Sequence, residues 1–297
     1  MASQPVLIVG GLGQVGQALM ATARSLHEHP DVVALSRDDV DLERPETIEA
    51  ALEQHRPSAV FNCAVFHPVD LCETQPERAF SVNAIGVRHL AWACRSRGVR
   101  LVQVSTDYVF AGEQRVPYKE EARPCPLSVY AASKLAGEHL ALAASPTHMV
   151  VRTSAVFGRP TAGHGSVCFI ERMLERAHAG QPTRVVNDQF VSPTYAVDLA
   201  ATLWELLACG GSGVYHVANR GACSWFDIAR VVFDAAGKRP LLAPTTASEF
   251  GAPAQRPQYS ALDNAQLRML GLPDLRPWQE ALRAFLRKHH AELATTV

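Results

Sequence analysis

The sequence predicts a doubly wound α/β fold, with a parallel sheet in its first half and a smaller C-terminal lobe. Short apolar runs rich in β-branched residues alternate with longer segments of helical periodicity over residues 6–153, a pattern typical of βαβ units. A glycine-rich turn joins the first strand to the first helix. After about Ser154 the alternation loosens, which indicates a second structural unit.

Five strands are expected in the first half, each a run of apolar and β-branched residues: Val6–Gly10, Val32–Ser36, Ala59–Ala64, Leu101–Thr106 and Met149–Thr153. Helical periodicity fills the intervals between them, at Gln14–Leu26, Pro45–His55, Pro76–Arg97 and Leu127–Ala144. Because right-handed crossovers join parallel strands, the carboxyl ends of these strands should lie along one crevice, where ligands bind in such folds.

The second half mixes turn-rich, helical and irregular segments. We expect a loop at Pro160–Gly165, an irregular segment at Arg184–Pro193, a strand at Val214–Ala218, and helices at Val167–Gly180, Thr194–Cys209 and Trp278–His290. Ser224 is predicted to cap a further helix, with Asp227 at its third position. We predict that residues 1–154, with parts of 194–218, form the parallel-sheet domain, and that 155–193 and 219–297 form the smaller lobe.

The composition is that of an ordinary globular protein. Of the 297 residues, 47% are hydrophobic and 19% are charged, and the formal net charge is −1. This charge gives no reason to expect nucleic acid or an anionic membrane as a partner, and no apolar run approaches the length that spans a bilayer. The N-terminal residues lack the basic flank and cleavage site of a signal peptide. We therefore expect a cytoplasmic protein.

The cysteine and histidine patterns point to no metal site. The seven cysteines are scattered and never spaced Cys-x-x-Cys, which favours reduced and mostly buried thiols. The pair His289-His290 is interpreted as a solvated helix end. We expect no metal ligands in this chain.

The turn after the first strand carries Gly10, Gly13 and Gly16 in the spacing Gly-x-x-Gly-x-x-Gly. Glycine permits a tight turn and lets a pyrophosphate approach the backbone, while a helix N-terminus offers unpaired N–H groups and a favourable dipole. A plain glycine-rich turn is the alternative, but the position at the first βα junction favours a dinucleotide. Residues 1–154 are therefore predicted to form a Rossmann-like NAD(P)-binding domain, and the later segments a substrate-binding lobe.

The residues after the second strand bear on the choice between NADP and NAD. That strand ends at Ser36-Arg37, and Asp38 follows. An arginine at this place accommodates the 2′-phosphate of NADP through a charge-assisted hydrogen bond, whereas an acidic residue binds the ribose hydroxyls. Arg37 favours NADPH, and Asp38 keeps NADH open. Asp41 and Leu42 are expected near the adenine.

Tyr130 and Lys134 stand four residues apart in an expected helix, so their side chains share one face. A free tyrosine has a pKa of about 10, which a neighbouring ammonium and an oxidised nicotinamide both lower. We predict that Tyr130 donates a proton to a carbonyl oxygen as the nicotinamide delivers a hydride. Thr106, at a strand end, would hydrogen-bond the same oxygen, and Lys134 would also hold the nicotinamide ribose. The structural alternative is a half-buried aromatic ring beside a solvated lysine.

Together these residues resemble the extended short-chain dehydrogenase/reductase superfamily, and within it the dTDP-4-dehydrorhamnose reductase family. The matching segments span nearly the whole chain: Gly10–Gly16, Asn62–Asp70, Ser105–Gly112, Tyr130–Glu138, Arg152–Ser154, Asn187–Thr194 and Arg256–Asp263. The segments Asn187–Thr194 and Arg256–Asp263 are much more specific than the tyrosine–lysine pair, so the resemblance extends beyond the superfamily pattern.

The resemblance implies a role for each matching residue. The implied catalytic residues are Thr106, Tyr130 and Lys134. The implied cofactor contacts beyond the glycines and Arg37 are Gln14, Val15, Asp41, Leu42, Ala64, Val65 and Phe66, joined by Tyr130 and Lys134. The implied substrate contacts are Thr106, Asp107, Tyr108 and Arg256. Arg256 would pair with a diphosphate, although a solvated loop arginine is the alternative.

The chain departs from the family pattern at two places. Reductases of the rhamnose pathway usually carry tryptophan after Arg-Thr-Ser, where this chain has Ala155. Loss of that aromatic side chain reshapes the sugar pocket, because aromatic residues supply much of the contact area. His67-Pro68 replaces the more usual small polar residues before Val69-Asp70. Neither change alters the expected class of reaction, but the identity of the hexose stays open.

The function that the resemblance implies is NADPH-dependent reduction of a nucleotide-activated 4-keto-6-deoxyhexose, with dTDP as the expected nucleotide. Two alternatives stay open: a sugar-nucleotide epimerase with bound NAD, and a non-catalytic NADP-binding regulatory subunit resembling that of methionine adenosyltransferase. Dehydration is disfavoured because Tyr108 stands where a dehydratase would carry glutamate. A homodimer is also left open.

Overall fold

The computed structural model describes residues 4–26, 30–159, 161 and 167–290. Its centre is a six-stranded sheet in the order β10-β5-β4-β3-β1-β2, in which all neighbouring strands are parallel. Its strands are β1 (Val6–Val9), β2 (Val32–Leu35), β3 (Ala59–Asn62), β4 (Arg100–Thr106), β5 (Met149–Thr153) and β10 (Gly213–His216). The predicted doubly wound α/β fold is confirmed.

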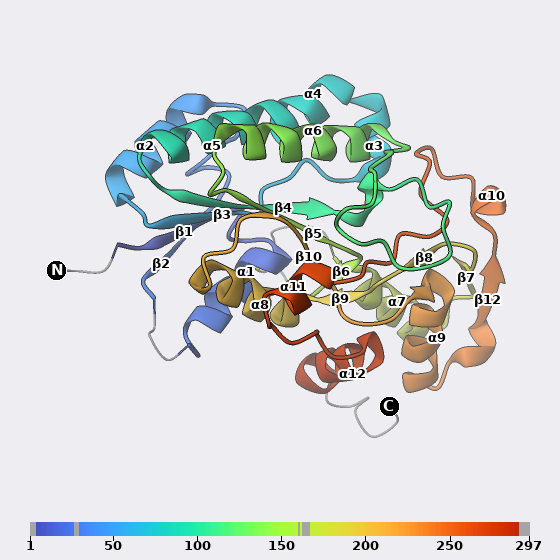
Figure 1. Ribbon diagram of the computed structural model, residues 1–297. Helices are drawn as coiled ribbons and strands as arrows, with labels where there is room; N and C mark the ends of the chain where they lie inside the picture. The colour runs from blue at the N-terminus through green and yellow to red at the C-terminus, as the bar shows by residue number, and fades with distance from the viewer. Residues whose placement is uncertain (1–3, 27–29, 160, 162–166, 291–297) are drawn as a thin grey trace.

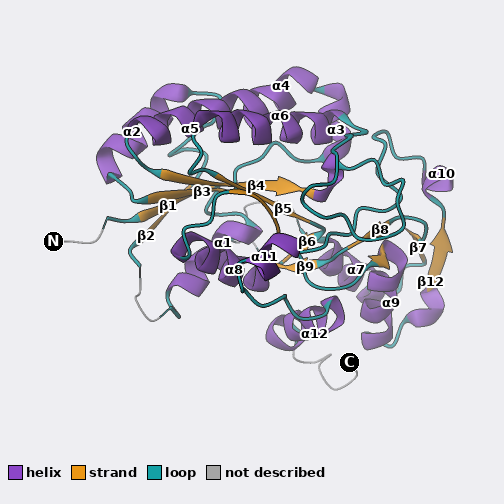
Figure 2. Ribbon diagram, in the orientation of Figure 1, coloured by secondary structure: helices purple, strands orange, loops and turns teal. Residues whose placement is uncertain are grey.

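Helices cover both faces of this sheet (Figures 1 and 2). One face carries α2 (Pro45–His55), α3 (Val69–Thr74), α4 (Pro76–Phe80), α5 (Val87–Ser96) and α6 (Val129–Ala144). The other face carries α1 (Gln14–Ala23) and α8 (Ala196–Ala208). On that second face Trp204 packs edge-on against Phe61, with ring centroids 5.0 Å apart. The β-branched strands are thus buried on both sides, as parallel sheets require.

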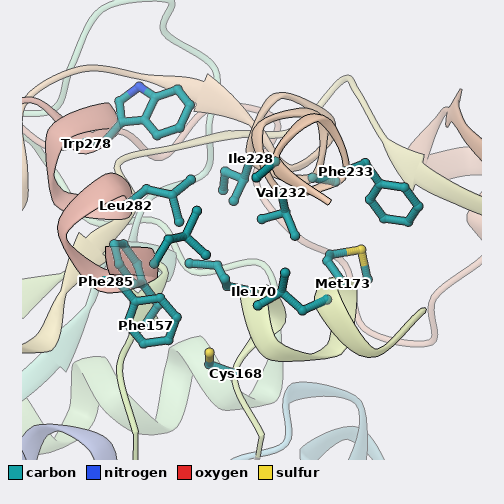
Figure 3. Packing of buried hydrophobic residues seen from close by; sticks show 14 of the residues in the cluster. Phe157, Cys168, Ile170, Met173, Ile228, Val232, Phe233, Trp278, Leu282 and Phe285 are labelled. Atoms are coloured by element: carbon teal, nitrogen blue, oxygen red, sulfur yellow. The ribbon is translucent and has the colours of Figure 1, made fainter. Parts of the chain in front are cut away.

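A second group of elements packs beside the sheet, around a core of its own. Figure 3 shows this core, in which Phe157, Ile170, Val232 and Phe285 are buried. Its helices are α7 (Phe169–His178), α9 (Trp225–Ala235), α10 (Ala247–Phe250) and α12 (Trp278–His289). Short strands pair in twos: β6 (Val156–Phe157) with β9 (Thr194–Tyr195), β8 (Phe190–Val191) with β11 (Cys223–Ser224), and β7 (Thr183–Val186) with β12 (Leu242–Thr245). The exact domain limits given above stay a prediction.

Four short helices complete the described elements: η1 (Ser81–Gly86), η2 (Asp107–Val109), η3 (Arg239–Leu241) and α11 (Ala265–Met269). None of the helices in the described ranges is both long and apolar enough to cross a membrane. The loop expected at Pro160–Gly165 falls, apart from Thr161, outside the described residues.

The prediction of an irregular segment at Arg184–Pro193 is wrong in two places. Thr183–Val186 forms strand β7, and Phe190–Val191 forms strand β8. Each pairs with a strand that is distant along the chain, so periodicity within the segment carries no sign of the partner. The helix expected from Thr194 likewise begins only at Ala196, because Thr194 and Tyr195 pair with β6.

Two predicted helix ends have different outcomes. The N-terminus of α9 is a capping box as expected: Ser224 Oγ accepts from the backbone N–H of Asp227, and the Asp227 carboxylate accepts from the backbone N–H of Ser224. The solvated end expected at His289-His290 is wrong, because His290 Nε2 lies 3.0 Å from the Glu171 carboxylate and its side chain is only 13% exposed. This contact joins the end of α12 to α7.

The helix expected over Pro76–Arg97 is interrupted by a π-helical segment, η1 (Ser81–Gly86). It is packed tightly against α6, and a Cβ atom added at Gly137 would clash with the backbone carbonyl of Asn83. Wider turns of this kind often occur at functional sites. Here the wide turn places Asn83 at the contact between the two helices.

Gly137→Ala should therefore destabilise the protein, although alanine favours helix formation by about 1 kcal/mol over glycine. We expect a loss of about 2–3 kcal/mol of unfolding free energy from the clash with Asn83, measured by urea denaturation. Ala136→Gly, at the neighbouring position, is the control for propensity alone and should cost about 1 kcal/mol. A Gly137→Ala variant more stable than wild type would contradict the tight α6–η1 contact.

Candidate active site

A cleft of about 1230 Å³ runs along the carboxyl ends of the strands, from the glycine turn to the second group of elements. Every residue proposed above for catalysis, cofactor binding or substrate binding lines it: Gly10, Gly13, Gln14, Val15, Gly16, Arg37, Asp41, Leu42, Ala64, Val65, Phe66, Thr106, Asp107, Tyr108, Tyr130, Lys134 and Arg256. The two departures, His67 and Ala155, line it as well. The structure thus brings the predicted residues into one site, while their individual roles stay predictions.

The glycine turn leaves the start of α1 open to the cleft. Gly13 is the N-cap, so no side chain caps the first N–H groups, and the first turn contains no acidic residue. Gly10 has φ +77°, and a Cβ there would come within 2.7 Å of the backbone nitrogen of Ala64. A Cβ at Gly16 would come within 2.6 Å of the Gly10 carbonyl oxygen. These positions require glycine, and the uncapped N-terminus suits a phosphate group.

The end of β2 presents a hydroxyl group and an exposed guanidinium at the rim of the cleft. The backbone N–H and the Oγ of Ser36 donate to Asp39 at 2.8 and 2.7 Å, and these hydrogen bonds lower the pKa of the Asp39 carboxyl. Arg37 donates to Glu43 at 2.7 Å and lies 3.4 Å from Asp41. Its side chain remains 58% exposed, so its guanidinium can reach a further anion.

Thr106, Tyr130 and Lys134 meet where β4 ends beside the first turns of α6. Ser128 caps this helix, since its Oγ accepts from the Ala131 N–H at 3.3 Å. Lys134 Nζ donates to the Val104 carbonyl oxygen at 2.7 Å, which uses one of its three protons. Burial lowers the pKa of Lys134 to about 8, against the opposing effect of the Glu138 carboxylate. The lysine is therefore still charged at neutral pH.

The Lys134 ammonium does not bring about the expected lowering of the Tyr130 pKa, and the contribution expected from an oxidised nicotinamide stays a prediction. Burial raises the pKa of Tyr130, the interaction with the Thr106 hydroxyl opposes this, and the negative charge of Asp107 adds to the rise. Desolvation thus outweighs any effect of the nearby ammonium. Tyr130 accordingly carries its proton at neutral pH, which is the state that donates to a carbonyl oxygen.

A buried ion pair holds α6 against the sheet directly behind these residues. Glu138 accepts from Arg152 through both carboxylate oxygens, with Nη2–Oε2 at 2.7 Å and Nε–Oε1 at 3.0 Å. The side chains are 2% and 5% exposed. Ser105 Oγ on β4 also donates to Glu138. Tyr130, Lys134 and Glu138 recur every four residues, so all three lie on the face of α6 that packs on the sheet.

Asp107 lines the cleft and is held by hydroxyl groups of the protein, while its expected contact with substrate stays a prediction. Oδ2 accepts from Ser154 at 2.8 Å and from Ser260 at 2.5 Å, and Oδ1 accepts from Thr106 at 3.2 Å. Burial raises the pKa of Asp107 to about 6, although these three hydrogen bonds favour the ionised form. Its carboxylate therefore positions Thr106 and joins the site to the C-terminal segment through Ser260.

Arg256 joins the C-terminal segment to α3 at the cleft. Nη2 donates to Asp70 at 3.0 Å, and Nη1 donates to the Ala254 carbonyl oxygen at 2.9 Å. The hydrogen bond from Arg256 lowers the pKa of the Asp70 carboxyl. Burial lowers the pKa of Arg256, but its interactions with neighbouring side chains, chiefly Asp70, outweigh this effect, so the pKa of Arg256 is raised. The solvated loop arginine considered above is thus not what the structure contains, and Arg256 remains a candidate for anion binding.

Several residues of the site carry no sign of their role in the sequence. Asn83 holds Phe66 by two hydrogen bonds, accepting from its N–H at 2.8 Å and donating to its carbonyl oxygen at 3.1 Å. Ser260 reaches Asp107 across 153 positions. Glu138 and Arg152 lie in the motifs noted above, but only the fold reveals that they pair. The one signal available in the sequence was Glu138, which lies eight positions after Tyr130.

The cleft contains no activated thiol in its described residues. Burial raises the pKa of the Cys63 thiol to about 12, although Lys134 opposes the effect, so the thiol stays protonated. Within the described ranges no group of three or more His, Cys, Asp and Glu side chains could hold a metal ion.

Fold and site together define the class of protein. A doubly wound sheet, an uncapped glycine turn, and Thr106, Tyr130 and Lys134 at one cleft are the features of an extended short-chain dehydrogenase/reductase. The family can be stated more narrowly. The chain belongs to the family described as the RmlD substrate binding domain, whose model matches residues 4–291.

Comparison with named relatives supports this family assignment. The chain is 40% identical over 290 residues to a dTDP-4-dehydrorhamnose reductase of Mycobacterium tuberculosis, covering 96% of this chain and 93% of that one. It is 37% identical over 278 residues to a dTDP-4-keto-6-deoxy-D-glucose reductase of Streptomyces niveus, with 93% and 94% covered. A solved dTDP-4-dehydrorhamnose reductase of Bacillus anthracis, in complex with NADP, superposes with a TM-score of 0.90 at 33% identity, covering 96% and 99%.

The buried ion pair should show strong coupling in a double-mutant cycle. Glu138→Leu and Arg152→Leu each leave one buried charge without its partner, so each should cost about 3–5 kcal/mol of unfolding free energy. The double variant should lose clearly less than the sum of the two, because it leaves neither charge. Guanidinium denaturation at neutral pH measures all three. Strictly additive losses would show that the two side chains do not interact.

Lys134 should make the stability of the protein depend on pH. Its pKa of about 8 lies below that of an unfolded lysine, so between about pH 8 and 10 the unfolded chain binds the extra proton and stability rises with pH. Lys134→Met removes this effect and should be about as stable as wild type or up to ~2 kcal/mol more stable at pH 7. The wild type should gain relative to the variant toward pH 10. A pH-independent difference in urea denaturation would contradict the lowered pKa.

Proposed function

We propose that this protein is an NADPH-dependent reductase that converts the C4 carbonyl of a dTDP-linked 4-keto-6-deoxyhexose to a hydroxyl. The observation that carries the proposal is the meeting of Thr106, a protonated Tyr130 and Lys134 at a cleft that begins at an uncapped glycine turn. The named relatives are reductases of such dTDP-linked keto sugars. Fold, site chemistry and family thus support the same reaction.

The cofactor half of the cleft fits a dinucleotide with a 2′-phosphate. Gly13 leaves the N-terminal N–H groups of α1 free of side chains for the pyrophosphate. Ser36 and the exposed guanidinium of Arg37 lie at the rim, where a 2′-phosphate would find a cation. When bound, NADPH supplies a hydride to the carbonyl carbon. NADP in the related structure from Bacillus anthracis supports this choice.

The other half of the cleft fits an anionic substrate. Among its described lining residues from 155–193 and 219–290, no side chain is acidic and four are arginines: Arg172, Arg176, Arg184 and Arg256. Arg184 pairs with Glu249 and Arg256 with Asp70. Arg172 has no ion-pair partner within the described part of the chain and lines the cleft from α7. An unpaired arginine beside the catalytic region suits a diphosphate.

The three catalytic side chains have separate roles in the reduction of the carbonyl group. Tyr130 holds the proton and donates it to the carbonyl oxygen as negative charge develops there. Thr106 donates its single hydroxyl proton to Asp107 at 3.2 Å, and it turns this proton to the same carbonyl oxygen when the sugar binds. Lys134 has two protons left beyond its hydrogen bond to Val104, and with these it holds the ribose of the nicotinamide. Its positive charge favours the phenolate of Tyr130 that remains after the proton has been transferred. Solvent protons then restore Tyr130.

The two alternative functions are not favoured. The curated relatives named above are reductases, whereas an epimerase would retain its NAD without net oxidation. A non-catalytic regulatory subunit would not need the complete set of Thr106, Tyr130 and Lys134 that lines this cleft. We further propose a cytoplasmic location and keep a homodimer as a prediction to be measured in solution.

Tyr130→Phe should lower kcat by about a thousandfold, because the proton donor is lost. The dissociation constant for NADPH, followed by fluorescence titration, should change less than about twofold, since the ring remains. Tyr259→Phe is the matched control: Tyr259 is buried but lies outside the cleft lining, and its variant should turn over normally. Wild type should oxidise NADPH stoichiometrically with a dTDP-linked keto sugar. If Tyr130→Phe retained this activity, Tyr130 would not be the proton donor.

A further inference from the structure

His67 lies directly against the ring of Tyr130. The two ring centroids are 5.5 Å apart with an interplanar angle of 75°, an edge-to-face arrangement that aromatic rings favour. His67 also lines the cleft, and it is exposed to solvent there. A side chain that touches the proton donor and faces the same cleft is positioned to meet any carbonyl compound that reaches Tyr130.

The backbone that carries His67 is fixed on both sides. The preceding residue, Phe66, is held at its N–H and its carbonyl oxygen by the Asn83 side chain, at 2.8 and 3.1 Å. The same Asn83 amide donates to Ser133 Oγ on α6 at 3.0 Å. The following residue is Pro68, the N-cap of α3, which restricts the backbone of His67 to extended conformations. His67 is therefore preorganised relative to α6.

The surroundings keep the imidazole neutral. Although one side of His67 is exposed in the cleft, the protein groups packed around its ring lower its pKa by desolvation, and the positive charges of Lys134, Arg256 and Arg172 lower it further. At neutral pH the ring thus offers one N–H donor and one nitrogen acceptor. Such a group can both give and receive a hydrogen bond from a sugar hydroxyl without adding to the positive charge of the site. Ala155, which lines the same cleft, offers only a methyl group.

We propose that His67 is a substrate-binding residue that hydrogen-bonds a hydroxyl group of the hexose ring close to the reacting carbonyl, and so helps to select the sugar. The inference rests on the proposed function, because that hydroxyl belongs to the nucleotide-linked hexose. A site built to hydrogen-bond a hydroxyl group discriminates strongly against ligands that leave its polar group unpaired. If the imidazole only filled space against Tyr130, any ring of similar size would serve.

Two variants separate these roles. His67→Phe keeps a ring against Tyr130 and loses both nitrogen atoms, whereas His67→Gln keeps a donor and an acceptor and loses the ring. His139→Phe is the control, since His139 is exposed on α6 and does not line the cleft. Calorimetry with NADP⁺ present gives dissociation constants for dTDP-rhamnose and for dTDP alone, and steady-state kinetics gives kcat and KM.

His67→Phe should weaken binding of dTDP-rhamnose and raise KM about tenfold, while binding of dTDP and NADPH changes less than about twofold. His67→Gln should recover part of the loss, and His139→Phe should match wild type. Unchanged dTDP-rhamnose binding in His67→Phe, or equal weakening of dTDP and dTDP-rhamnose, would overturn this inference alone. A wild-type protein that turns over no nucleotide-linked keto sugar would overturn the proposed function as well.

Discussion

The buried ion pair between Glu138 and Arg152 is the interaction on which the site depends. It ties α6 to β5 through three hydrogen bonds of a planar guanidinium, and Ser105 extends it to β4. Burying two charges is expensive unless the geometry is good and the remaining lone pairs are satisfied, and both conditions are met here. Since Lys134 and Tyr130 lie one and two turns before Glu138, fixing the glutamate also fixes the rotation of the helix and the direction of both side chains.

The same arrangement sets the chemistry. Burial on the sheet face of α6 raises the pKa of Tyr130 and lowers that of Lys134 to about 8, so at neutral pH the tyrosine is neutral and the lysine charged. This is the pair of states that a reductase needs before the carbonyl is reduced. Asp107 extends the fixed region, because its hydrogen bonds to Ser154 and Ser260 tie the loop after β4 to the C-terminal segment.

The parts of the fold that local pattern governs could be predicted from sequence. Buried parallel strands are continuous apolar runs, and the four-residue spacing of Tyr130 and Lys134 follows from helix geometry alone. The parts that depend on distant partners could not. Strand β7 pairs with β12, about sixty positions away, and the π-helical turn at Asn83 packs closely against Gly137, more than fifty positions away. The pKa of Tyr130 was expected to fall because the sequence shows the nearby lysine, whereas the depth of burial that raises it appears only in the fold.

The central claim is that one face of α6 and the end of β4 present a carbonyl carbon of the sugar to the nicotinamide and its oxygen to Tyr130. NADPH deuterated at the transferring position of nicotinamide C4, incubated with a dTDP-linked 4-keto-6-deoxyhexose, tests this directly by mass spectrometry and NMR of the product. The account predicts one deuterium on sugar C4 for each NADPH consumed, and a solvent-derived hydrogen on the new hydroxyl. A product that carries no deuterium at C4, or one formed without consumption of NADPH, would contradict it.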